Sequence, residues 1–97
     1  MLEIELHEEA DEELKAAAVF YELRLTGLGE SFLARVSESL DLISTNPLAG
    51  HPLFDDYRRI LTRQFPYSLV YRVEGERVYI IAVAHWSRRP DYWKERS

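Results

Sequence analysis

An unbroken apolar run constrains the fold of this chain more than any other feature. Residues 78–84 read Val-Tyr-Ile-Ile-Ala-Val-Ala, which is almost wholly apolar. Neither face of this segment carries a charged side chain that would favour exposure to water. A strand of this kind lies inside a sheet with both faces covered. The residues before it, Glu74-Gly75-Glu76, are typical of a tight turn, so we predict a hairpin with residues 67–73.

The hydrophobic period changes twice along the chain. Residues 2–6 alternate between apolar and polar side chains, which predicts a half-buried strand. Apolar residues then recur every three or four positions, as in an amphipathic helix, until Asn46-Pro47 stops the pattern. The predicted elements are a strand at 2–6, helices at 8–27 and 29–46, a loop at 47–57, strands at 57–65, 67–73 and 77–84, and a helical turn that starts at Pro90.

These elements predict an α+β fold in the order β-α-α-β-β-β. The two helices are joined by a short connection, so we expect a helix hairpin packed on a mainly antiparallel sheet. A chain of 97 residues is the size of one domain, and we expect a single domain over residues 1–97.

Composition excludes several classes of function. The chain has no cysteine, and its three histidines lack partners at ligand spacing, so we expect no metal site. We expect no other cofactor, since the glycines are single and form no phosphate loop. The first residues do not resemble a signal peptide, and no apolar run approaches the roughly 18–20 residues that span a bilayer. A cytoplasmic protein without membrane contact is expected.

The net charge of −5 is unevenly distributed. Residues 1–46 carry 11 acidic and 3 basic side chains, whereas residues 47–97 carry 6 acidic and 9 basic ones. The strand-rich half therefore has a net charge of +3 and could present a basic face to an anionic group, or its arginines could be a solvated surface. The candidate residues for binding a target or a phosphate are Arg59, Arg63, Arg72, Arg88 and Arg89.

Alternation along residues 57–65 places Arg59 and Arg63 on one side of the predicted strand. Two arginines so spaced could hold a phosphate, or could pair with nearby carboxylates such as Asp55 and Asp56. His85 follows the apolar run and is a candidate acid–base residue, although a lone histidine is more often a hydrogen-bonded structural or surface residue. Tyr67 and Tyr71 share a face with apolar neighbours, so we expect them in the core.

The order and spacing of several short motifs resemble the RelE/ParE family of bacterial toxins. The matching segments are Phe65-Pro66-Tyr67, Tyr71, Ala82-Val83-Ala84-His85 and Arg88-Arg89-Pro90-Asp91-Tyr92-Trp93. The resemblance implies a toxin of a type II toxin–antitoxin module, neutralised by a cognate antitoxin. It also implies a target, which is either DNA gyrase, for ParE-like members, or the ribosome and its messenger RNA, for RelE-like members.

The resemblance implies two candidate catalytic residues, His85 and Tyr92, which match positions used by metal-independent ribonucleases of the family. Two arginines common in those ribonucleases are absent, because Ser68 and Trp86 stand at their positions. The acidic net charge also departs from that type. These differences favour ParE-like inhibition of gyrase over ribosome-dependent cleavage of messenger RNA. A family member that binds an antitoxin but has lost toxicity is a third hypothesis.

Overall fold

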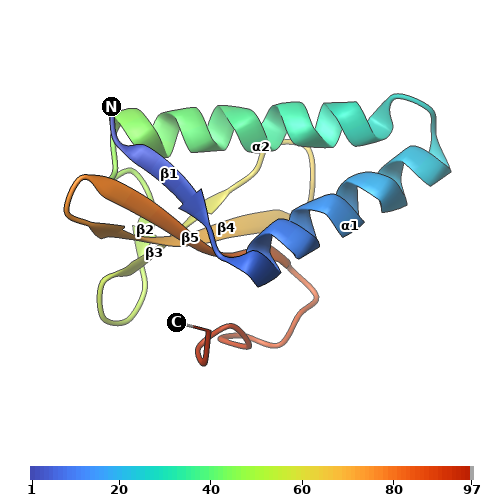
Figure 1. Ribbon diagram of the computed structural model, residues 1–97. Coiled ribbons are helices and arrows are strands. Elements are labelled where there is room, and N and C mark those ends of the chain that lie inside the picture. Colours follow the sequence, from blue (N-terminus) through green and yellow to red (C-terminus); the bar gives the residue numbers. More distant parts are fainter. Residues whose placement is uncertain (97) are drawn as a thin grey trace.

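Two helices pack on one face of a five-stranded sheet, and the C-terminal segment, residues 86–96, crosses the other face (Figure 1). The computed structural model describes residues 1–96. Its elements are β1 (Glu3–Leu6), α1 (Glu8–Arg24), α2 (Leu28–Thr45), β2 (His51–Pro52), β3 (Tyr57–Leu61), β4 (Tyr67–Glu74) and β5 (Arg77–His85). The sheet order is β1-β5-β4-β3-β2, with β1 parallel to β5 and every other pair antiparallel. The predicted α+β fold is confirmed.

The helix hairpin closes through a carboxylate. Glu22, near the end of α1, accepts hydrogen bonds from the backbone N–H groups of Gly27 and Gly29 at the start of α2, at 2.9 and 3.1 Å. These N–H groups have no partner inside the helix, so the carboxylate acts as a cap. Gly29 also lets the helices approach closely, because an added Cβ would lie 2.6 Å from the carbonyl oxygen of Ala18.

The main core lies between the helices and the sheet. Apolar side chains from α1, α2, β4 and β5 fill it, among them Ala10, Phe32, Ile43, Leu69, Tyr71 and Ile80, all fully buried. The predicted core position of Tyr71 is therefore confirmed. Its hydroxyl also accepts from the N–H of Gly50 and donates to the carbonyl of Pro47, which ties the loop after α2 to the sheet.

A β-bulge shapes the opposite face of the sheet. Val70 pairs with Ala82 and Tyr71 with Ile80, so Ile81 is an extra residue in β5. Ile81 and Ala82 consequently both join a second apolar cluster on the face away from the helices, together with Val70 and Trp93. Both faces of β5 are covered, as its apolar sequence predicts.

Three local predictions were wrong. Residues 51–52 form a short strand within the predicted loop. The strand predicted at 57–65 ends at Leu61, because Gln64 adopts a left-handed backbone conformation with φ 74° and the chain turns there. The helical turn predicted at Pro90 is instead a succession of tight turns, with Asp91 at φ 62°.

Neither helix of the part described, residues 1–96, has the length and apolar character needed to cross a membrane.

Candidate functional site

The C-terminal segment, residues 86–96, is held against the sheet by a buried tryptophan. The indole of Trp93 is 3% exposed and stacks on Phe54 with ring centroids 5.5 Å apart and an interplanar angle of 1°. Its centroid lies 4.9 Å from that of Tyr57. Trp93 therefore fixes the segment at the loop before β3, and it buries Val70, Ile81 and Ala82 behind it.

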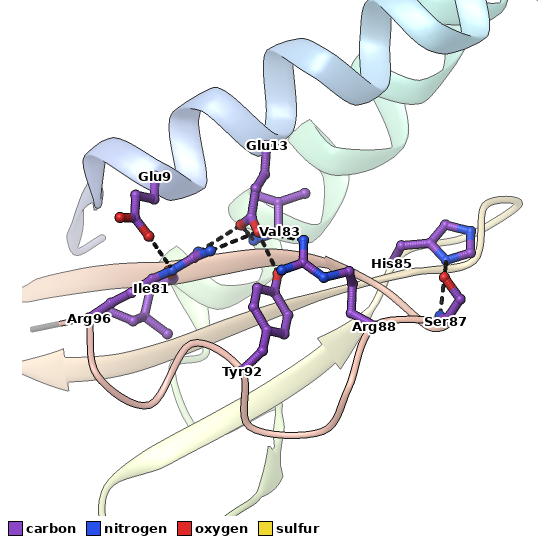
Figure 2. A network of polar contacts seen from close by, with 9 residues as sticks. All are labelled: Glu9, Glu13, Ile81, Val83, His85, Ser87, Arg88, Tyr92 and Arg96. Atoms are coloured by element: carbon purple, nitrogen blue, oxygen red, sulfur yellow. Dashed lines mark hydrogen bonds and ion pairs between the residues drawn. The ribbon is translucent and has the colours of Figure 1, made fainter.

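A second anchor of this segment is the carboxylate of Glu13, which projects from α1 (Figure 2). Its oxygens accept hydrogen bonds from Arg96 Nη1 and Nη2 at 2.8 and 2.9 Å and from the hydroxyl of Tyr92 at 2.5 Å. The backbone N–H of Val83 in β5 donates to the same carboxylate at 3.0 Å. One side chain thus joins the helix, the sheet and the C-terminal segment.

Charge and hydrogen bonding set the protonation states in this network. Burial acts to raise the pKa of Glu13, but the hydrogen bonds from Arg96, Tyr92 and Val83 and the charge of Arg96 outweigh it and lower the pKa below its usual value. Burial and the Glu13 carboxylate raise the pKa of Tyr92 well above that of an ordinary tyrosine. Tyr92 is therefore a neutral phenol that keeps its proton and donates a hydrogen bond to Glu13.

A groove of about 410 Å³ opens between this segment and the exposed face of the sheet. Small or buried side chains of β4 and β5 form its floor, namely Ser68, Val70 and Ala84. Arg59 and Leu61 of β3 form one wall. The opposite wall is the C-terminal segment, from Trp86 through Arg88, Arg89 and Pro90 to Trp93. The groove is apolar at its base and carries arginines at its rim.

His85 ends β5 beside this groove, but its ring is held by its own chain. The backbone N–H of Ser87 donates to Nδ1 at 2.9 Å, and Ser87 Oγ lies 2.7 Å from the same nitrogen. Because a backbone N–H can only donate, Nδ1 carries the lone pair of the neutral ring. The ring also packs edge-on against Tyr67, with centroids 5.0 Å apart. Figure 2 shows the imidazole turned toward Ser87 and away from Tyr92.

The structure brings five of the seven candidate site residues to one groove. Those five are Arg59, His85, Arg88, Arg89 and Tyr92. Arg88 lies over the ring of Tyr92 at 3.8 Å from its centroid, and its guanidinium is 3.8 Å from Glu13. Both side chains therefore take part in anchoring the segment.

Arg63 and Arg72 lie elsewhere. The predicted pairing of Arg59 with Arg63 on one strand face was wrong, because β3 ends before Arg63, whose guanidinium reaches Glu38 on α2 at 3.4 Å. Arg72 shares the open face of the sheet with the groove but does not line it. It donates to the hydroxyl of Tyr57 at 2.9 Å and pairs with Glu74.

Two residues that matter most to this site were not singled out from the sequence. Glu13 stands among five acidic residues at the start of α1, and only the fold separates it from those neighbours. Arg96, its partner, lies 83 residues away. The sequence feature that came nearest to indicating this network was Tyr92, because its hydroxyl requires a hydrogen-bond partner when the ring is buried.

Comparison with known proteins agrees with this description. A sequence model of the family described as "ParE toxin of type II toxin-antitoxin system, parDE" matches residues 4–90. A chain in the solved structure of the chromosomal ParDE TA system from P. aeruginosa has the same fold, with a TM-score of 0.71 and 21% identity. The alignment covers 88% of this chain and 96% of that one. No curated protein sequence matches the chain.

The fold and the groove together define an architectural class. A helix hairpin covers one face of a mainly antiparallel sheet, and the other face carries an anchored C-terminal segment and an open groove. The family match then gives the assignment, since it extends over most of the chain. This chain belongs to the ParE toxin family of type II toxin–antitoxin systems.

Proposed function

We propose that this chain is the toxin of a toxin–antitoxin pair, that a cognate antitoxin neutralises it, and that it inhibits DNA gyrase by binding. We place it in the cytoplasm, with the DNA on which gyrase acts. Family membership supports the toxin role.

The observation that carries the proposed target is that the hydroxyl of Tyr92 and the Nδ1 atom of His85 are both engaged by contacts inside the chain. Tyr92 donates to Glu13, and the lone pair of His85 Nδ1 faces Ser87. Cleavage of a phosphodiester requires a proton acceptor within reach of the substrate and charge stabilisation at the phosphate. Inhibition of gyrase requires a complementary surface, and the arginine-rimmed groove is the surface that we assign to this role.

The positions that differ from family ribonucleases support the same proposal. Ser68 is 5% exposed in the floor of the groove, and Trp86 is an exposed indole at its wall. Neither carries charge. Loss of one preorganised donor lowers the rate of catalysis by about 10²–10³. The absence of two such donors therefore argues against efficient cleavage of RNA.

Ribosome-dependent cleavage of messenger RNA is the second candidate function. One observation favours it: Arg59, Arg88 and Arg89 line the same groove as His85. These arginines could bind a phosphate near the imidazole, provided that Ser87 releases Nδ1.

Expression of the wild type and of His85→Ala tests the choice of target. We expect both to lower DNA supercoiling and arrest growth while transcripts stay intact. Rapid transcript cleavage that disappears in His85→Ala, with supercoiling unchanged, would make the chain a ribonuclease. Normal growth and unchanged supercoiling with either variant, despite antitoxin binding, would indicate a family member without toxicity.

A further inference from the structure

The groove carries basic side chains that have no carboxylate partner among the described residues. Arg59 and Arg89, both exposed, form no ion pair or side-chain hydrogen bond with any residue between 1 and 96. Carboxylates are abundant in this chain, with 17 acidic side chains against 12 basic ones. Most other basic side chains do pair, as Arg77 does with Glu5 and Arg96 with Glu9 and Glu13.

The apolar residues of the same groove are exposed as well. Leu61 on one wall is 54% exposed and Trp86 on the other is 58% exposed. Between them the floor is lowered by two small side chains, Ser68 and Ala84, so a partner's apolar side chain has space to enter. Burial of that side chain between Leu61 and Trp86 would remove apolar surface of both partners from water, which favours association.

Together these observations specify the chemistry of a ligand. It has an apolar side chain for the hollow and carboxylates on either side for Arg59 and Arg89. A bidentate carboxylate contact suits the guanidinium group, and the opposite charges fix the register of the bound segment. Resting on the proposed function, we propose that this groove is the docking site for an acidic, apolar segment of the antitoxin.

A nucleic acid is the competing occupant, because phosphates also bind arginines and a base can stack on an exposed indole. One feature favours a protein segment. The base and walls include aliphatic side chains, such as Leu53, Leu61 and Val70, which offer no hydrogen bonds to a base.

The test measures binding of the full chain to its antitoxin, sought as the product of a short reading frame beside its own gene, and to short overlapping peptides that cover the antitoxin sequence. The groove variants are Arg59→Glu, Arg89→Glu and Trp86→Ala. Arg24→Glu is the matched control, because Arg24 is also exposed and without a carboxylate partner, but lies at the end of α1. All four side chains are on the surface, so circular dichroism and Tm should be unchanged.

We expect each groove variant to weaken antitoxin binding by about tenfold or more and the control to bind like the wild type. The binding peptide should be net acidic and contain a large apolar residue. Its affinity should fall as salt rises from about 0.1 M to 1 M, which shortens the Debye length from about 10 to about 3 Å.

Three results would overturn the proposal. Groove variants that bind the antitoxin like the wild type would exclude this docking site while leaving the proposed function intact. A single-stranded oligonucleotide that binds the wild type and not the groove variants, with antitoxin binding retained, would assign the groove to nucleic acid. A wild-type chain that does not bind the antitoxin at all would overturn the antitoxin pairing and the docking site together.

Discussion

Tyr92 donates its hydroxyl hydrogen to Glu13 across 2.5 Å, and this bond joins the C-terminal segment to a helix 79 residues earlier in the sequence. The same carboxylate holds Arg96 by two hydrogen bonds. Because the segment forms one wall of the groove, the shape of the groove depends on a residue of α1 that does not line it.

Replacement of Glu13 by alanine should lower the free energy of unfolding by about 3 kcal/mol, the cost of removing one partner from a largely buried ion pair. Arg96, Tyr92 and the N–H of Val83 all lose their acceptor. Urea unfolding at neutral pH measures the change. Glu12→Ala is the control, since Glu12 is exposed on the same helix and should stay within about 0.5 kcal/mol of the wild type.

Glu13 should also make the protein sensitive to acid. Its pKa is lowered in the folded state, so its contribution is fully present above its ordinary value of 4.5 and is lost as pH falls from there through the folded pKa. Urea unfolding of the wild type and Glu13→Gln across this range should show a smaller fall in stability for the variant. Parallel curves would show that Glu13 titrates alike in both states.

Tyr92→Phe separates a structural from a catalytic role. Loss of the hydroxyl should lower the free energy of unfolding by about 1–2 kcal/mol, because a charged acceptor loses one donor. Growth inhibition should persist at a temperature where the variant is folded. A variant with wild-type stability and no toxicity would instead place Tyr92 at the target.

Gly50→Ala should destabilise the fold because Gly50 lies against the ring of Tyr71. An added Cβ would lie 2.6 Å from the hydroxyl oxygen and 2.8 Å from Cε1 of Tyr71, so side chain or backbone has to shift, at about 1–3 kcal/mol. The Tyr71→Phe background removes the oxygen but keeps Cε1, so the same substitution should cost less there and still destabilise the fold. Equal costs in both backgrounds would show that the hydroxyl contributes nothing to the clash.

The sequence predicts those parts of the fold that depend on local pattern. The apolar run at 78–84 places β5 inside the sheet, and the helical period defines α1 and α2. Strand ends are harder to predict, because Leu61-Thr62-Arg63 continues the alternation while Gln64 turns the backbone into the left-handed region. The strand His51–Pro52 is too short to leave a pattern, and it forms only because β3 offers a partner.

The site, like the fold, could be predicted only where it depends on local sequence pattern. Motif order brings His85, Arg88, Arg89 and Tyr92 into consideration, and they do lie near one groove. The hydrogen bond from Tyr92 to Glu13 could not be predicted from the sequence. No local pattern distinguishes the carboxylate of Glu13 from neighbouring carboxylates that stabilise the start of a helix through the helix dipole. The exposure of Arg59 and the pairing of Arg63 likewise depend on where β3 ends.

The most direct test of the central claim is a supercoiling assay with purified components. Gyrase is given relaxed plasmid in the presence of the purified chain, and the chain is incubated separately with translating ribosomes and messenger RNA. The account predicts inhibited supercoiling that added antitoxin relieves, with intact messenger RNA. Unimpeded supercoiling together with cleaved messenger RNA would contradict it.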